Sequence, residues 1–296
     1  MKKILSILLI ASIFALSAPV TEAAIISDRS YRASIRKEQK NDIKQIKALF
    51  KKHEQLANNH DLDGLNILYS DKYVNNDGFD KKAYFKSIEA TWETCKDLTY
   101  STEILSIEIN GDHANVYVNE TASGTLVEKI EDFSIAGEIH SKAKGIYHLE
   151  SINGNWYISG ETALSDESSL VYGDARYMNI EIQAPSQVNS GEQYTASLKV
   201  DADTNTLITA SINSDPVIYP AKTPQDDLRM LPETQILERI IKANTDNLNE
   251  YVIASMAISK VKPVNIENYK IYMAGLACVM KRVNVVPKNN FIKLED

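Results

Sequence analysis

Towards the N-terminus, two histidines and a glutamate are the residues whose types and spacing most clearly suggest a chemical function. His53 and Glu54 begin like the zinc-protease pattern H-E-x-x-H, but position 57 is Ala57 and the next histidine is His60. Seven residues of helix would hold the two imidazoles about 10 Å apart, which is too far for one zinc ion. The spacing therefore predicts no metal site here, and no cofactor-binding motif occurs elsewhere in the chain.

A second motif resembles the opening of a calcium-binding loop. Asn59, Asp61 and Asp63 alternate before Gly64, but the twelfth position, where such a loop needs a bidentate glutamate, is Ser70. We therefore interpret the motif as a helix boundary, with Asp61 capping the unpaired backbone N–H groups of a short helix.

These motifs lie among three predicted helices. The apolar residues of 42–57 recur at three- and four-residue spacing, and a short helix is expected over 62–68. Asp80 is the predicted cap of a third helix, whose apolar stripe must be buried against something. The stripe consists of Tyr84, Phe85, Ile88 and Trp92.

After position 98 the apolar period changes from about 3.6 to 2, which indicates strands. One hairpin is predicted over 105–118, and a second joins 137–152 to 155–162 through Asn153-Gly154, a strong turn signal. Helices followed by antiparallel strands predict an α+β fold, with the helices packed on a curved antiparallel sheet.

The stretches NNHDLDGLNILYSDKYV, GDHANVYV and YHLESINGNWYIS resemble the nuclear-transport-factor-2-like superfamily, which includes ketosteroid isomerase and polyketide-cyclase-like members. The resemblance covers about 43–162, within a predicted domain of 42–164. It implies a cone with a pocket between helices and sheet, a function of either enzyme or binding protein, and a possible homodimer through the open sheet face.

The implied pocket nominates one carboxylate. If Ala114, Val116 and Val118 face inward, alternation along the strand also turns Glu120 inward. A carboxylate among aromatic rings could act as a general base, whereas at a strand end it would simply reach water. The aromatic residues that either line the pocket or fill the core are Tyr73, Tyr84, Trp92, Tyr147 and Trp156. The isomerase pattern of a helix tyrosine with two strand acids does not map cleanly onto this sequence.

The second half of the chain has a different pattern of apolar and turn residues. Short strands separated by turn residues predict an all-β sandwich over 175–288, after a polar linker at 165–174 and before a tail at 289–296. Pro185-Ser186 followed by Ser190-Gly191-Glu192 between apolar strands is similar to bacterial immunoglobulin-like modules. The segment 233–243 suits a helix as well as a strand.

The first 23 residues are typical of a signal peptide: two lysines, the apolar run 4–16 and small residues before Ala23. A leader at 24–41 would follow, and the protein would be periplasmic or secreted, with no transmembrane segment in the mature chain. The net charge of −8 disfavours nucleic acid as a partner. The sequence leaves open whether Cys95 and Cys278 are paired.

Two functions remain open. The first is an exported, non-catalytic binding protein, whose cone holds a small apolar ligand or a partner such as an envelope or surface protein, and whose sandwich adds an interaction module. The alternative is a small-molecule isomerase, cyclase or hydratase that uses Glu120 as proton carrier. An open cavity beside a buried Glu120 would favour the enzyme, whereas a filled one would exclude it.

Overall fold

The computed structural model of the protein describes residues 22–130, 133–203, 205–218, 227–264 and 268–288. The chain divides into two compact units, Met1–Lys44 and Gln45–Asp296. The predicted signal peptide lies outside the described residues except for Glu22 and Ala23, and the predicted tail at 289–296 lies outside them entirely. Within the described ranges, no helix combines the length and hydrophobicity that a membrane span requires.

The three expected helices are present as α1 (Glu22–Asn58), α2 (Leu62–Asn66) and α3 (Lys81–Thr94). α1 starts before the predicted position 42, so the residues expected to form a leader at 24–41 are helical. Both predicted caps are confirmed: Asp61 accepts a hydrogen bond from the N–H of Gly64 at 2.8 Å, and Asp80 accepts one from Ala83 at 2.8 Å.

The strands that follow are antiparallel and longer than expected: β2 (Thr99–Asn110), β3 (His113–Ile130), β4 (Phe133–Ile152) and β5 (Asn155–Gly173). The hairpin turn at Asn153-Gly154 is confirmed, with φ values of 53° and 78° that suit this dipeptide. A short strand missed in the sequence, β1 (Tyr69–Asn75), precedes α3 and pairs in parallel with β5. The α+β class of this part is as predicted.

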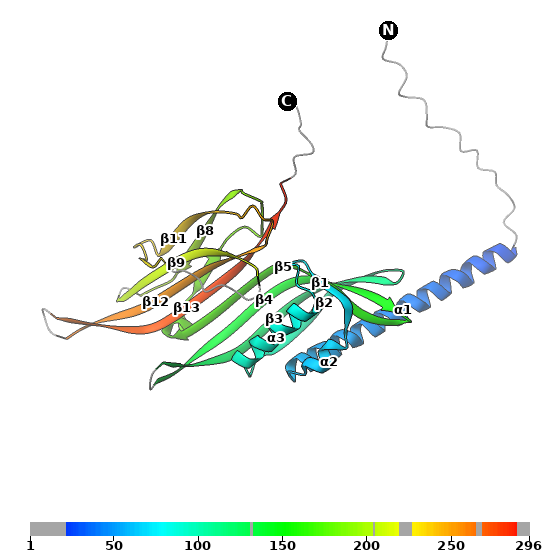
Figure 1. Ribbon diagram of the computed structural model, residues 1–296, viewed down its shortest axis with the longest axis horizontal. Coiled ribbons are helices and arrows are strands. Elements are labelled where there is room, and N and C mark those ends of the chain that lie inside the picture. The colour runs from blue at the N-terminus through cyan, green and yellow to red at the C-terminus, as the bar shows by residue number, and fades with distance from the viewer. Residues whose placement is uncertain (1–21, 131–132, 204, 219–226, 265–267, 289–296) are drawn as a thin grey trace, which may run out of the picture. The chain divides into compact units, whose positions relative to one another are not determined.

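The linker expected at 165–174 is wrong, because this segment continues β5 and then forms the short 3-10 helix η1 (Asp174–Tyr177). β5 pairs with β4 on one side and, from Glu167 to Gly173, with β13 (Tyr269–Val286) on the other. The regions predicted as separate domains therefore share one sheet, ordered β10-β9-β12-β13-β5-β4-β3-β2 (Figure 1).

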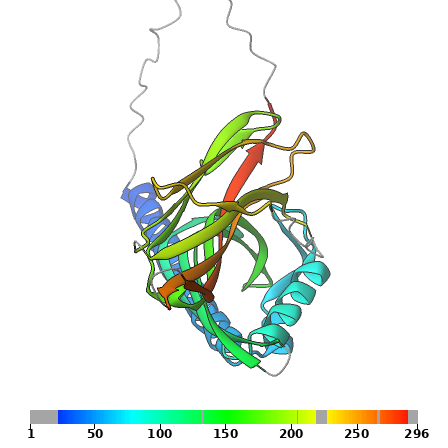
Figure 2. The same ribbon diagram turned by 90° about the vertical axis from the view of Figure 1, so that its left-hand side faces the viewer.

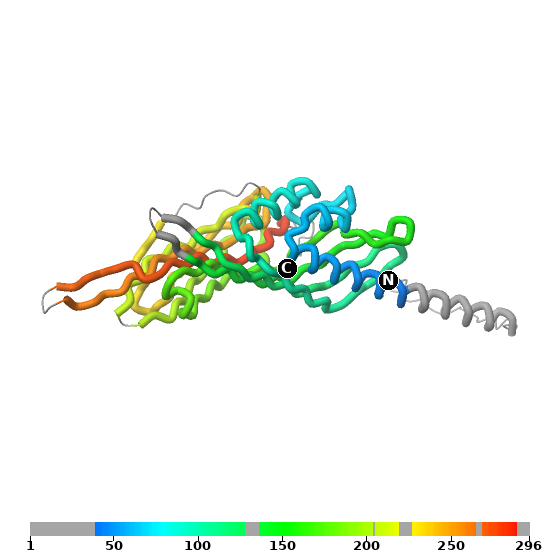
Figure 3. Tube along the Cα trace, turned by 90° about the horizontal axis from the view of Figure 1, so that it is seen from below, coloured from blue at the N-terminus to red at the C-terminus, as the bar shows by residue number. Residues whose placement is uncertain are grey.

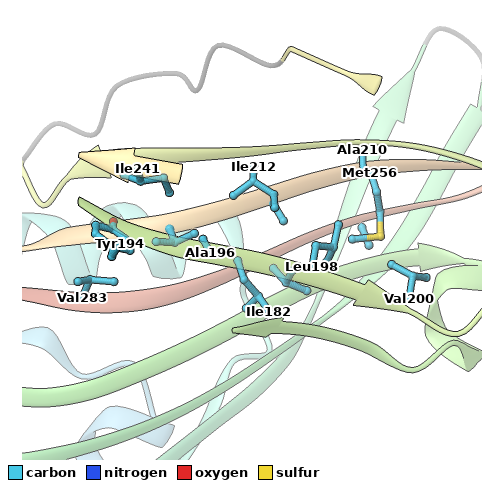
Figure 4. Close-up of a cluster of buried hydrophobic side chains, with 14 of the residues drawn as sticks. Ile182, Tyr194, Ala196, Leu198, Val200, Ala210, Ile212, Ile241, Met256 and Val283 are labelled. Carbon is cyan, nitrogen blue, oxygen red and sulfur yellow. The ribbon is translucent and has the colours of Figure 1, made fainter. Parts of the chain in front are cut away.

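The second half is built from β strands in two layers. The large sheet receives β7 (Gln187–Asn189), β9 (Thr206–Pro216), β10 (Arg229–Met230) and β12 (Glu250–Pro263). A three-stranded sheet contains β6 (Ile180–Gln183), β8 (Gln193–Val200) and β11 (Ile236–Lys242), so the ambiguous segment 233–243 contains a strand. Buried side chains of both sheets interdigitate, among them Leu198, Ile212 and Met256 (Figure 4).

A second hydrophobic core lies between the helices and the inner face of β2–β5. Phe50 of α1 and Phe85 of α3 are buried against strand residues such as Val116 and Ile158. Figure 2 shows α3, in cyan, beside the curved green strands. Both helices bury their apolar stripes against the same face of the sheet. The side chains of these stripes therefore determine how much space is left between the helices and the sheet.

A buried ion pair joins the turn before α3 to β13. Two nitrogens of the Arg282 guanidinium donate to the carboxylate of Asp77 at 3.0 and 2.5 Å, and the amide of Asn249 donates to the same carboxylate at 2.7 Å. The Arg282 side chain is 1% exposed and that of Asp77 is 8% exposed. The turn that leads into α3 is therefore held by the second half of the protein.

Candidate functional site

A cavity of about 180 Å³ separates the helices from the inner face of the sheet. Its walls come from helices α1, α2 and α3 and from strands β1 to β5, and they are mostly aromatic and aliphatic. Four of the six residues predicted to bind a ligand line it: Tyr84, Trp92, Glu120 and Tyr147. The cone is thus partly open, and the aromatic face of α3 lines the space as well as filling the core.

Glu120 faces this cavity from the middle of β3, not from a strand end, because β3 continues to Ile130. Its register partners are Thr102 on β2 and Ala143 on β4. The carboxylate accepts hydrogen bonds from the hydroxyl of Tyr147 at 3.0 Å and from that of Thr102 at 3.2 Å. Burial raises the pKa of Glu120, while these two hydrogen bonds oppose the rise.

A second carboxylate, Glu161 of β5, lines the same cavity and was not predicted from the sequence. It lies opposite Tyr147 in the sheet and accepts a hydrogen bond from the hydroxyl of Tyr73 at 3.2 Å. Burial, with the negative charge of Glu120 as a second cause, raises the pKa of Glu161 from 4.5 to about 7. A carboxyl group with this pKa exchanges its proton near neutral pH.

Glu161 was missed because of a β-bulge. Strict alternation from Trp156 and Ile158 would turn Gly160 inward and Glu161 outward. The register of β5 against β4 slips between these positions, so that Ile158 pairs with Leu149 but Glu161 pairs with Tyr147. One extra residue thus reverses the orientation of the strand's side chains and brings the carboxylate into the cavity.

His53 of α1 also lines the cavity, although the sequence suggested it only as a failed metal ligand. Its Nε2 lies 2.8 Å from the hydroxyl of Tyr69 in β1. Burial lowers the pKa of His53 to about 4, so the imidazole is neutral at pH 7. Burial also raises the pKa of Tyr69, which keeps its hydroxyl protonated as a potential hydrogen-bond donor.

Two predicted ligand contacts lie elsewhere. Trp156 is 7% exposed and belongs to the hydrophobic core. Tyr73 is 1% exposed and donates a hydrogen bond from its hydroxyl to the Glu161 carboxylate. Trp92 lines the cavity and is held by two contacts: its indole N–H donates to the Tyr100 hydroxyl at 2.9 Å, and its ring stacks on His60 at a centroid distance of 4.6 Å. His60 is therefore a packing residue.

Metal-binding side chains do not gather at this site. Throughout the described ranges, no group of three or more His, Cys, Asp or Glu side chains is arranged to hold an ion. Cys95 is buried and Cys278 is partly exposed, and no disulfide joins them, which answers the question of pairing that the sequence left open. What the cavity offers a ligand is apolar surface, tyrosine hydroxyls and two carboxyl groups.

No protein-family model and no curated protein matches the chain. Similar solved structures include a putative scytalone dehydratase from Novosphingobium aromaticivorans, 13% identical, covering 43% of this chain and 86% of that chain with a TM-score of 0.37. A hexachlorocyclohexane dehydrochlorinase, LinA Type2, is 13% identical over 43% of this chain and 86% of that chain, with a TM-score of 0.35.

A nuclear-transport-factor-2-like protein from Cytophaga hutchinsonii is 16% identical over 42% of this chain and 95% of that chain, with a TM-score of 0.30. That protein is described as nuclear-transport-factor-2-like, which is the superfamily that the sequence of residues 43–162 resembles. All three likenesses cover less than half of this chain, and with TM-scores below 0.5 they carry no argument about what it does.

Proposed function

We propose that the protein is a small-molecule enzyme that moves a proton on a mostly apolar substrate within this cavity. The observation that carries the proposal is the pair of carboxyl groups, Glu120 and Glu161, that share one apolar space with a raised pKa. When two carboxyl groups share a cavity, repulsion between their negative charges separates their pKa values, so that one group can hold a proton while the other is ionised.

The roles follow from the partners of each group. Glu161 has a pKa of about 7, which suits a general base near neutral pH. Glu120 is held by hydrogen bonds from Tyr147 and Thr102, and its negative charge helps to raise the pKa of Glu161. When the neutral His53 carries its proton on Nε2, the ring donates to the Tyr69 hydroxyl, and this hydroxyl can then donate its own proton to a substrate oxygen.

For a substrate with a carbonyl group, the chemistry balances within the site. The Glu161 carboxylate takes a proton from the carbon next to the carbonyl, and the electron pair of that C–H bond forms the enolate. A hydroxyl donor such as Tyr69 stabilises the oxyanion, and Glu161 returns the proton to the same or a neighbouring carbon. An isomerase of this kind needs no cofactor.

Deuterium exchange tests the proposal. The purified protein is incubated in D₂O with a panel of cyclic ketones and enones, and C–H exchange is followed by NMR. Glu161→Gln is expected to lower the exchange rate by about 10²–10⁴-fold, the usual contribution of a general base, and wild-type kcat/KM should rise through pH 7. The matched control, Glu108→Gln, alters an exposed glutamate of β2 and should leave exchange unchanged. Exchange by Glu161→Gln at the wild-type rate would exclude this role.

A non-catalytic binding protein is the second candidate. It is favoured by the hydrogen bonds that already engage Glu120, whose oxygen Oε1 accepts from both Tyr147 and Thr102. In this alternative the cavity stores or carries a small apolar ligand, and the second half, proposed as an immunoglobulin-like module, contacts an envelope or surface protein after export. Native mass spectrometry of protein from its own host separates the two, because a carrier would retain its ligand while promoting no exchange, and the same spectrum reports whether a homodimer forms.

A further inference from the structure

The hairpin formed by β12 and β13 extends past the strands that flank it. β9 pairs with β12 as far as Lys260, and β5 pairs with β13 only up to Gly275. Beyond Val261, whose N–H donates to the carbonyl of Asn205 at 3.1 Å, the two strands pair with each other and with no other strand among the described residues. Figure 3 shows this projection in orange and red. We refer to residues 260–264 and 268–273 as the ribbon.

One face of the ribbon is apolar. Cross-strand partners share a face, and the register pairs Val261 with Ile271 and Pro263 with Tyr269, with Met273 next along the same face. Tyr269, Ile271 and Met273 are 65%, 61% and 65% exposed. A two-stranded hairpin is marginally stable in water by itself, so an uncovered apolar face at this point is costly unless something binds it.

The opposite face carries three lysines beside the exposed side chains of Tyr272 and Val264. Lys262 lies directly across from Lys270, and Lys260 is paired with Tyr272. Lys260 forms an ion pair with Asp174 at 2.6 Å, but within the described ranges neither Lys262 nor Lys270 has an acidic partner. Like charges directly opposite in a sheet destabilise it, and an anionic surface would reverse that effect. This positive site stands out on a chain with a net charge of −8.

We propose that the ribbon docks the protein on a lipid bilayer with anionic headgroups. The apolar face enters the boundary between headgroups and acyl chains, and the flexible stems of Lys262 and Lys270 carry their ammonium groups to the phosphates. The two strands of the ribbon, of five and six residues, span only about 17–20 Å by 10 Å. This is narrow for a stable protein–protein interface of about 800 Å² per partner, whereas a bilayer accepts a narrow apolar edge and adds charge attraction.

Vesicle flotation of the full-length protein tests the proposal. Binding is expected to vesicles of 30% phosphatidylglycerol in phosphatidylcholine, to weaken in pure phosphatidylcholine, and to fall as salt is raised. The double change Lys262→Gln and Lys270→Gln should lower the partition coefficient about 25-fold, or about fivefold for each lysine. Ile271→Ser should lower it at least tenfold.

The matched control is Ile240→Ser, which removes an isoleucine that is 71% exposed on β11, away from the ribbon. All variants keep the same N-terminal segment, so binding through the apolar run 4–16 would persist in every ribbon variant and overturn the proposal. A loss of binding in Ile240→Ser equal to that in Ile271→Ser would overturn it as well.

A depth probe gives an independent readout. The chain has only two tryptophans, Trp92 and Trp156, both buried in the cone. Ile271→Trp adds one on the apolar face, and lipids brominated on their acyl chains should quench its emission while leaving the parent protein unaffected. Absence of quenching would refute lipid docking. A ribbon variant that changes the subunit count, measured by light scattering, without changing flotation would also refute it and would assign the surface to contact between copies.

Discussion

Replacement of Glu161 by glutamine should make the protein more stable at alkaline pH. The folded state binds the proton of Glu161 more tightly than the unfolded chain, since burial raises the pKa from 4.5 to about 7. The contribution of this group to stability is therefore fully present below pH 4.5 and is lost as the pH rises through 7. The glutamine variant cannot lose it, because glutamine does not ionise.

The magnitude follows from the two pKa values. The interval from 4.5 to about 7 corresponds to at most about 3 kcal/mol. Glu161 is half-buried beside an open cavity and shares its titration with Glu120, so we expect Glu161→Gln to exceed the wild type by about 1–3 kcal/mol at pH 8 and to match it at pH 4.

Urea unfolding followed by tryptophan fluorescence, repeated from pH 4 to pH 9, measures this difference directly. Glu108→Gln provides the control for removing a glutamate from an exposed position, and its offset from the wild type should stay constant across the range. A stability gain of Glu161→Gln that is the same at every pH, or that is largest at acid pH, would refute a raised pKa as its cause.

Three further predictions concern the framework. Arg282→Met leaves the buried Asp77 carboxylate without its guanidinium and should lower the free energy of unfolding by about 3–5 kcal/mol in urea, with Asp77→Asn in the same chain recovering part of the loss. Asp80→Ala removes the cap of α3 and should cost about 1 kcal/mol by the same measurement; no loss would mean that the cap is replaced by water. Gly173→Ala should lower the melting temperature, because Gly173 has a φ of 58° and an added Cβ would clash with the carbonyl oxygen of Ala274; an unchanged melting temperature would contradict that backbone geometry.

Local signals in the sequence predicted the elements of the cone well. Apolar spacing identified the helices, side chains at Asp61 and Asp80 marked where two of them begin, and Asn153-Gly154 marked a hairpin. Each of these features depends on residues within a few positions of one another, so a single sequence contains the necessary information. The inward orientation of Glu120 was also predictable, because alternation along β3 is unbroken.

Features that depend on distant partners were not predictable. The polar segment 165–174 resembles a linker, yet its polar groups are satisfied within the sheet: Asp166 accepts hydrogen bonds from Ser141 at 3.3 Å and from Tyr251 at 2.6 Å. Strand β1 depends on its parallel neighbour β5. Glu161 depends on a bulge, which pairing with β4 determines and which composition does not reveal.

The sharing of β5 between the two halves has a consequence for the order in which the protein can fold. The partner that completes one edge of β5 is β13 (Tyr269–Val286), so a ribosome must translate about a hundred residues beyond β5 before that edge is covered. Until then the growing chain presents an unpaired strand that other strands can join. Pairing across about a hundred residues is slow to form, and truncation after 174 would leave this edge of β5 without its partner strand.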